Sequence, residues 1–447
     1  MQDRLRPATL AALCLTEFAV LAALTVPAVV GLQLRVARFH DGLSPESRLS
    51  WVTTTGAVAA ILATPFFGWL SDRRIRRTGH RGPWLLGGAV VGCTAIQAAA
   101  QAPDLPLLVL AWAAAQAGYG ATFAALFGTL SDLVPRADRA RVSGLFAASG
   151  IASVAIGGGF AALLLSGRLG SFGTSTTVFT AFAWLSVPVA VLATWHLRGY
   201  ATSTLASVQV PLGSPVGSPV GNQHGSVREG LLALAGAGPA FWWLLLQRVL
   251  VQASYVCLTV YAVFFLVRRM GEKPHDAATL VAGITAIGGL VAMVVAAGAA
   301  RMLARQIGYR AAMGSGVALL LVANLLLAMA TERPAYVVAH LCAGAGLGTY
   351  LALDLVVAMT LVPAGVAGRV LGYFNVIRKL PQALVPSLGP AVLAIGAGDV
   401  TGADRSQNYF ALFVAGSLLA LVALALTGRL VVPDRREASE MHVTGAH

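Results

Sequence analysis

The sequence predicts an all-helical membrane protein, with twelve transmembrane helices arranged in two pseudo-symmetric halves of six. Composition, the spacing of apolar runs and an internal repeat predict this fold class. The chain of 447 residues is 57% hydrophobic and only 11% charged, whereas soluble globular proteins carry about a quarter charged residues. The net charge of +13 comes from arginines between apolar runs. We therefore expect no nucleic-acid partner, which would require a continuous basic surface.

Twelve apolar stretches are long enough to cross about 30 Å of hydrocarbon. They lie near 8–34, 50–71, 84–102, 105–131, 141–166, 175–197, 239–267, 277–300, 309–330, 334–362, 368–395 and 407–432. A Gly/Ser/Pro-rich stretch containing GSPVGSPVG separates the two sets of six and predicts a flexible linker. The predicted domains are an N-terminal half at 1–197, a cytoplasmic linker at 198–238, a C-terminal half at 239–432 and a cytoplasmic tail at 433–447.

The two halves share an internal repeat. The segment GYGATFAALFGTLSDLVP at 118–135 aligns without a gap to GLGTYLALDLVVAMTLVP at 346–363. Six residues past each LVP stands an arginine, Arg141 or Arg369, and three residues further a glycine. A repeat of about 228 residues across twelve spans predicts two parallel six-helix halves.

Basic residues are distributed unevenly between alternate loops. With the N-terminus inside, the predicted cytoplasmic segments hold 19 lysines and arginines, and the opposite side holds 9. Because Lys and Arg in short loops resist translocation, we expect both termini in the cytoplasm. Short loops and an Arg/Ala/Gly-rich composition are typical of a bacterial inner membrane. We expect a monomer in the lipid bilayer.

Several kinds of chemistry lack their sequence signals. Neither lysine follows a glycine, so a Walker A phosphate loop is absent and ATP-driven transport by this chain is not indicated. The four cysteines have no C-x-x-C spacing, so we expect no metal site. A membrane-embedded enzyme is one rival function, but the H-E-x-x-H and G-x-S-x-G motifs are both absent. We expect no enzyme activity and no cofactor besides a coupling proton.

The most informative stretch is the basic loop from Gly68 to Trp84, which reads GWLSDRRIRRTGHRGPW. It resembles the loop between helices 2 and 3 of the major facilitator superfamily, in the pattern G-x-L-S/A-D-R…G-x-R. His80 stands where that pattern usually has an arginine. The longer form, ending in Gly-Arg-Pro-Trp, resembles the branch of glycoside–cation and sucrose–proton symporters, with Gly82 in place of one basic residue. The matching residues are Gly68, Leu70, Ser71, Asp72, Arg73, Gly79 and Arg81.

The resemblance implies that this loop is a latch closing the cytoplasmic side of a transporter. Asp72, at the end of the second span, can accept hydrogen bonds from arginines or from the amino end of a helix. The alternative is a loop whose charge only sets topology. The predicted gating residues are Gly68, Asp72, Arg73 and Arg81, with a similar feature after the fourth span formed by Asp132 and Arg141.

Five charged residues fall inside apolar stretches: Glu17, Arg248, Asp354, Arg378 and Lys379. A charge at the bilayer centre costs about 2.5–3.5 kcal/mol on insertion scales, so each needs a partner or a water-filled cavity. Glu17 and Asp354 are the predicted proton-coupling residues, because protonation of a buried carboxylate responds to its neighbours. The resemblance to sucrose–proton carriers, which have a carboxylate in the first span, points the same way. A static ion pair of Arg248 with either carboxylate is the alternative.

Polar and aromatic side chains follow helical spacing on several spans. Such stripes suit a small polar solute with apolar faces, although an aromatic stripe in a membrane helix is also typical of packing. The predicted substrate-binding residues are Gln116 and Tyr119 in span 4, Arg248, Gln252 and Tyr255 in span 7, His340 and Tyr350 in span 10, and Asn375, Arg378 and Lys379 in span 11.

The predicted function is secondary active transport by alternating access, as proton-coupled symport of a sugar-like or anionic sugar-derived solute. Sodium coupling is not indicated, because the second span lacks the aspartates that melibiose-type carriers have there. The alternative is a proton-driven exporter of a drug or natural product. Drug–proton antiporters carry an arginine three residues before the span-4 glutamine, and this chain has Ala113 there.

Overall fold

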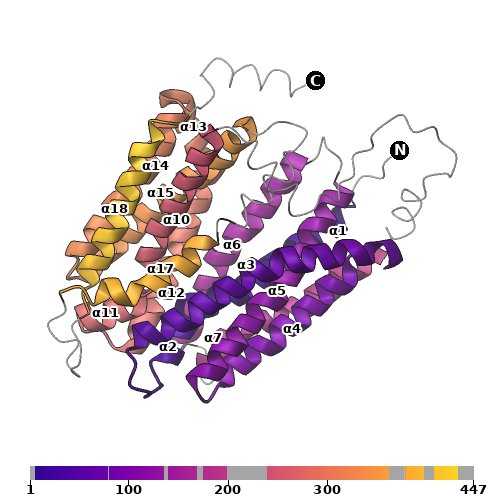
Figure 1. The fold of residues 1–447 in the computed structure, drawn as a ribbon, viewed down its shortest axis with the longest axis horizontal. Coiled ribbons are helices and arrows are strands. Elements are labelled where there is room, and N and C mark those ends of the chain that lie inside the picture. Colours follow the sequence, from indigo (N-terminus) through magenta and orange to yellow (C-terminus); the bar gives the residue numbers. More distant parts are fainter. Residues whose placement is uncertain are drawn as a thin grey trace. The chain divides into compact units, whose positions relative to one another are not determined.

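The computed structural model describes residues 6–78, 80–134, 139–168, 175–198, 239–361, 377, 379–396 and 407–430. Helices make up nearly all of these residues (Figure 1). Before the predicted linker they are α1 (Pro7–Val26), η1 (Pro27–Gly31), α2 (Leu32–Val36), α3 (Pro45–Thr78), α4 (Gly82–Gln101), α5 (Leu105–Leu133), α6 (Arg139–Leu165) and α7 (Ser175–Arg198). After it come α10 (Pro239–Thr259), α11 (Ala262–Met270), α12 (Pro274–Val294), η4 (Val295–Ala299), α13 (Ala300–Ile307), α14 (Tyr309–Met329), α15 (Arg333–Leu361), α17 (Leu380–Leu393) and α18 (Tyr409–Thr427).

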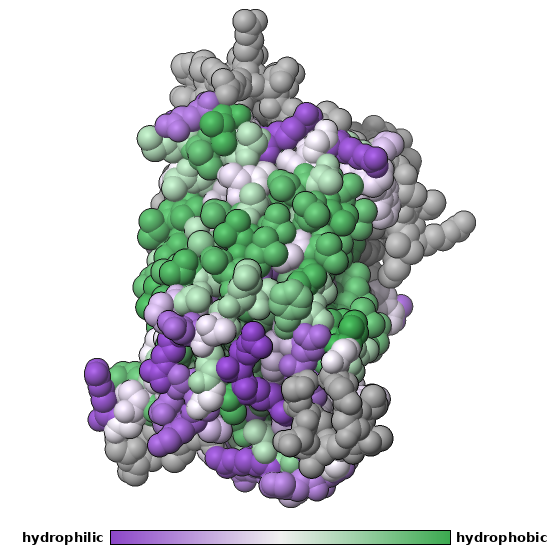
Figure 2. Space-filling model, turned by 90° about the vertical axis from the view of Figure 1, so that its left-hand side faces the viewer, coloured by the Kyte–Doolittle hydropathy of each residue, from purple (hydrophilic) through white to green (hydrophobic). Residues whose placement is uncertain are grey.

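The all-helical membrane fold is confirmed. Within the described residues, eleven helices are long and apolar enough to cross a membrane. The predicted span near 368–395 is represented by the shorter apolar helix α17, and the earlier part of that span lies outside the described residues. Figure 2 shows one face on which hydrophobic residues form a broad belt bordered by hydrophilic residues at both ends. The chain is a multi-pass membrane protein.

The chain packs as two compact units. Unit 1 comprises 1–210, 259–290 and 382–407, and unit 2 comprises 211–258, 291–381 and 408–447. Three of the boundaries between the units fall inside the predicted spans 239–267, 277–300 and 368–395. One end of each of these spans therefore belongs to unit 1. The predicted linker at 198–238 lies almost wholly outside the described residues, so the proposed half boundaries stay a prediction.

The internal repeat is visible in helix packing. A Cβ on Gly88 of α4 would lie 2.6 Å from the carbonyl oxygen of Gly118 of α5, so only glycine allows this approach. The same relation joins Gly316 of α14 to the carbonyl oxygen of Gly346 of α15, at 2.8 Å. Both glycines of the second pair lie 228 residues after those of the first. The two helix pairs thus pack through equivalent glycines.

The first and seventh spans each change helix type or break within the part of the chain assigned to unit 1. In the first, Pro27 begins the π-helical turn η1, and Gln33 follows two residues after that turn. In the seventh, α10 ends at Thr259 and α11 begins at Ala262. Gln33 Oε1 accepts a hydrogen bond from the backbone N–H of Val263, at 3.0 Å. The side chain of Gln33 thereby satisfies an amide near the start of α11.

Candidate functional site

Glu17 lies in the middle of α1 and is 6% exposed. Its Oε2 accepts a hydrogen bond of 2.6 Å from Ser149 Oγ of α6. Gly150 follows Ser149, and a Cβ there would lie 3.7 Å from Glu17 Oε1 and 3.2 Å from Leu21 Cδ1. The carboxyl group is therefore held between a hydroxyl and a glycine surface of α6.

Unit 2 contains a buried ion pair between the seventh and tenth spans. Arg248 of α10 donates through Nη1 to Asp354 Oδ2 of α15, and the side chains are 5% and 1% exposed. A buried pair is held in place because removing either partner leaves the other charge uncompensated. The two charged residues that the sequence placed at similar depth are therefore brought together.

On α15, Tyr350 lies one turn from this ion pair, whereas His340 lies about four turns away along the helix. Tyr350 lies one turn before Asp354 and is fully buried, and its hydroxyl has no hydrogen-bond partner among the described residues. A buried hydroxyl without a partner costs free energy, so this position would favour a polar group of a bound solute. His340, further along α15, lies over the ring of Tyr336 at 4.1 Å between centroids and has Nδ1 3.0 Å from the carbonyl oxygen of Tyr336.

Of the two predicted span-4 residues, Tyr119 is committed to helix packing. Tyr119 is fully buried, and its hydroxyl lies 3.1 Å from Ser186 Oγ of α7. A Cβ on Gly92 of α4 would lie 2.7 Å from the Tyr119 ring, so the ring fills the space that this glycine leaves. Gln116 is half-buried, with its Cγ 3.3 Å from a Cβ position on Gly56 of α3.

The remaining predicted binding residues lie on α10, just before α17, or outside the described residues. Gln252 and Tyr255 lie on α10 at one and two turns after Arg248, and both are partly exposed. Lys379 stands just before α17 and is also partly exposed. Asn375 and Arg378 lie outside the described residues.

Arg81 organises the basic loop. Its Nε donates to Asp132 Oδ2 at 2.9 Å, and its Nη1 donates to Asp72 Oδ1 at 2.5 Å and to Ser71 Oγ at 3.1 Å. Burial opposes the charge of this guanidinium, but bonding and attraction to Asp132 and then Asp72 raise its pKa above the usual value. Its planar group lies against Gly128 of α5, where a Cβ would approach within 2.6 Å. The ends of α3, α4 and α5 are therefore joined by one arginine.

Two other predicted gating residues, Gly68 and Arg73, do not join this network among the described contacts. A Cβ on Gly68 would meet only Ala124 Cβ, at an ordinary 3.9 Å, so packing at that position does not require glycine. The Arg73 guanidinium lies 3.9 Å from the centre of the Trp69 ring, in a cation–π contact. The side chain of Arg141 lies outside the described part of the chain.

Next to this loop, His80 Nδ1 accepts a hydrogen bond of 3.0 Å from the backbone N–H of Gly82, at the start of α4. Burial, and then repulsion by Arg198, lower the pKa of His80 below its usual value of 6.5. The neutral imidazole is the form that can accept this bond.

Sequence reasoning missed an ion pair at the opposite end of unit 1. Glu46, in the first turn of α3, is fully buried and pairs with Arg268 of α11, with Oε1 2.7 Å from Nε and Oε2 3.3 Å from Nη2. Ser50, one turn later, donates to the carbonyl oxygen of Pro386 of α17 at 2.5 Å. At this end the second span is therefore tied to the seventh and eleventh. Both residues stand near the ends of predicted spans. Their opposite charges at those positions were the only hint of pairing that the sequence offered.

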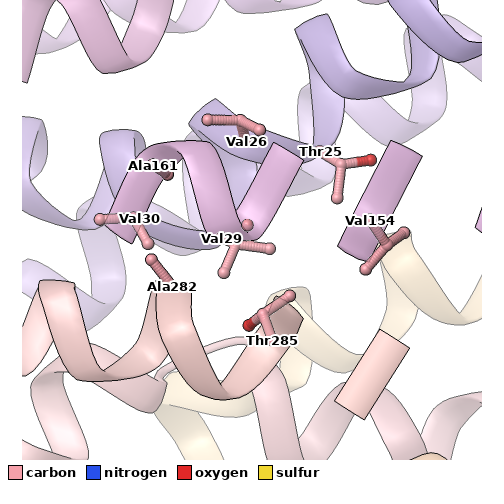
Figure 3. A pocket seen from close by; sticks show the side chains of 9 residues that line it. Thr25, Val26, Val29, Val30, Val154, Ala161, Ala282 and Thr285 are labelled. Carbon is pink, nitrogen blue, oxygen red and sulfur yellow. The ribbon is translucent and has the colours of Figure 1, made fainter. Parts of the chain in front are cut away.

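Unit 1 also has a small pocket between the first, fifth and eighth spans (Figure 3). It is lined mainly by short apolar side chains, and Thr25 and Thr285 supply the hydroxyl groups. Such a lining offers too few polar groups to orient a sugar-like solute. We do not assign this pocket to substrate.

Comparisons with known proteins agree with the fold. A family model described as Major Facilitator Superfamily matches residues 9–386. A bacterial homologue of the human lysosomal transporter Spinster, inward-facing and unoccupied, is similar with a TM-score of 0.70 at 17% identity, covering 95% of this chain and 97% of that chain. A mutant of the nucleoside transporter NupG gives 0.67 at 15% identity, with coverage of 94% and 99%. The peptide transporter POT in complex with sulfate gives 0.65 at 15% identity, with 96% of each chain covered. A comparison with curated protein sequences finds no match.

Proposed function

Because this chain belongs to the Major Facilitator Superfamily and is a membrane transporter rather than an enzyme, we propose that it is a proton-coupled symporter of a small polar solute. The solute is sugar-like or an anionic sugar derivative, and it crosses by alternating access. The protein lies in the cell (inner) membrane with both termini in the cytoplasm.

The buried pair between Arg248 and Asp354 is the observation that carries this proposal. Ionised groups at membrane depth are costly and are retained where they serve a solute or proton pathway. Protonation of Asp354 would neutralise that carboxylate and release Arg248 to bind an anionic group of the solute. Departure of the proton would restore the pair and expel the solute.

Two neighbouring features support the same assignment. The Tyr350 hydroxyl is buried one turn from Asp354 and is without a partner among the described residues, so it is available to a solute hydroxyl or carboxylate. Glu17 in α1 is a second buried carboxyl group, and it accepts a hydrogen bond from the Ser149 hydroxyl. We assign proton coupling to Glu17 and Asp354, and solute binding to Arg248 and Tyr350. The POT neighbour is described in complex with sulfate, an anion of the charge type proposed for the solute.

Transport into proteoliposomes with an imposed pH gradient tests this function. Labelled neutral sugars, sugar acids and hydrophobic cations are compared, each with and without a protonophore. We expect an inward proton gradient to drive accumulation of a sugar or sugar acid. If the gradient instead drives a hydrophobic cation in the direction opposite to protons, the chain is an exporter and the symport proposal fails.

Substitutions at the two carboxyl groups locate the proton pathway. Glu17→Gln should abolish gradient-driven accumulation while solute exchange at equal concentrations continues, because exchange needs no net proton movement. Thr16→Val is the matched control, since Thr16 is the buried neighbour on α1 and, among the described residues, bonds the Ala12 carbonyl oxygen at 2.8 Å. If Glu17→Gln still concentrates solute, Glu17 does not carry the coupling proton.

A further inference from the structure

Ser149 of α6 makes two short contacts through a single hydroxyl group. Its Oγ lies 2.6 Å from Glu17 Oε2 and 2.9 Å from the carbonyl oxygen of Phe146, one turn earlier on α6. A serine hydroxyl has one hydrogen to donate and two lone pairs with which to accept. Ser149 therefore cannot give a full-strength hydrogen bond to both oxygen atoms at the same time.

This constraint leaves two consistent arrangements of hydrogen. When Glu17 is ionised it can only accept, so Ser149 donates to Oε2. When Glu17 is protonated, its own O–H donates to Ser149 Oγ, and the serine hydrogen turns to the carbonyl oxygen of Phe146. Each arrangement satisfies every donor, and rotation of one hydroxyl converts one into the other as the proton binds.

We propose that Ser149 is the positioning residue that sets the pH at which Glu17 takes up and releases its proton. The proposal rests on the proton-coupling role of Glu17 proposed above and extends it to a residue on a second helix. A charge-assisted hydrogen bond is about twice as strong as a neutral one. Ser149 therefore stabilises the ionised carboxylate more than the protonated acid, and its loss favours the protonated form.

Ser149 is a polar contact that α6 supplies to Glu17 in mid-span. On α1 itself the nearest titratable group is Cys14, one turn earlier. Among the described residues, α1 packs mainly on α6 and α7, with a smaller contact to α5. Tyr119 in mid-α5 bonds Ser186. The other titratable or charged residues of these three helices lie near their ends: Asp132, Arg139, Arg141, His196 and Arg198.

Infrared difference spectroscopy of the full chain in lipid vesicles tests the proposal without a known substrate. The carboxylic C=O stretching band is recorded while the pH is varied, and the component lost in Glu17→Gln belongs to Glu17. Ser149→Ala should raise the midpoint of that component by about one pH unit, the difference between a charge-assisted and a neutral bond. It should also move the band to higher frequency, because the protonated acid loses its acceptor. Ser149→Thr keeps the hydroxyl and should restore both values.

Ser153 provides the matched control. It lies one turn further on α6, is fully buried, and donates to the carbonyl oxygen of Gly150 at 2.7 Å. Ser153→Ala should leave the Glu17 component unchanged. If Ser149→Ala also leaves the midpoint and frequency unchanged, the positioning role is refuted, even where Glu17→Gln abolishes accumulation. If Glu17→Gln removes no pH-dependent component, the coupling role of Glu17 fails instead.

Discussion

Neutralising one member of the Arg248–Asp354 pair should strongly destabilise the protein. The side chains are 5% and 1% exposed, so solvent screens neither charge. Removing one partner of a buried pair costs about 3–5 kcal/mol, because the remaining charge stays buried without compensation. Asp354→Asn keeps the shape and one acceptor oxygen but removes the charge. We expect the free energy of unfolding to fall by about 3 kcal/mol or more.

The double variant with Arg248→Gln and Asp354→Asn distinguishes charge from shape. It leaves two amides that can bond each other and no isolated charge, so most of the lost stability should return. The single changes should therefore be strongly non-additive, with a coupling energy of about 2–3 kcal/mol. Asp354→Asn should also abolish gradient-driven accumulation.

Equilibrium unfolding in mixed detergent micelles measures these values, with thiol labelling as the readout. Cys257 is buried on α10, the helix that carries Arg248, and becomes reactive when unit 2 unfolds. Gln252→Ala, one turn from Arg248 and partly exposed, is the control and should cost less than about 1 kcal/mol. Single changes that cost under about 1 kcal/mol, or that add in the double variant, would refute a buried ion pair here.

Three further predictions concern the two ends of unit 1. Arg81→Lys should raise proteolysis at the loop, because the single ammonium nitrogen of lysine does not reproduce the separate Nε and Nη1 donors that reach Asp132 and Asp72. The loss of stability should be about 1–2 kcal/mol, since both carboxylates are partly exposed. Unchanged cleavage would contradict the bridge. Glu46→Gln should increase labelling of a cysteine placed at Val267, next to Arg268, relative to the same cysteine with Glu46 intact, because the ion pair is lost. Equal labelling would argue against a closed end. The lowered pKa of His80 means that the native state disfavours its cation, so stability should fall as pH drops below about 6.5. Hydrogen exchange at the Gly82 amide should then accelerate, and His80→Gln should remove the pH dependence if the imidazole causes it.

The fold could be predicted because it depends on segment length and composition. The backbone N–H and C=O groups of about twenty consecutive apolar residues have no water to bond in lipid. They must therefore bond one another in a helix, whatever the neighbouring segments are. The repeat of 228 residues also predicted equivalent packing, which appears at Gly88 and Gly316. The pairing of Arg248 with Asp354, offered as an alternative from the sequence, is present because two buried charges of opposite sign at similar depth need each other.

The finer site could not be predicted, because helical spacing tells which residues share a face and not what that face meets. Tyr119 belongs to a regular polar stripe, yet it fills the space at Gly92 and bonds Ser186. Glu46 and Arg268 are separated by 222 residues, and only the packed structure brings them together. Ser149 gave no signal beyond a hydroxyl in an apolar run. Its role depends on which helix faces Glu17.

The Val263 amide donates a hydrogen bond to Gln33 where the first and seventh spans meet. Separating the two spans there would require water to replace Gln33 as the acceptor. Moving the first span away from the seventh would strip that N–H of its acceptor at a depth where lipid offers none, at a cost of roughly 1–3 kcal/mol. Water is the available replacement. Water should therefore enter between the first and seventh spans at the moment they separate. With an apolar residue in place of Gln33, the Val263 amide would need a water molecule even while the two spans are in contact.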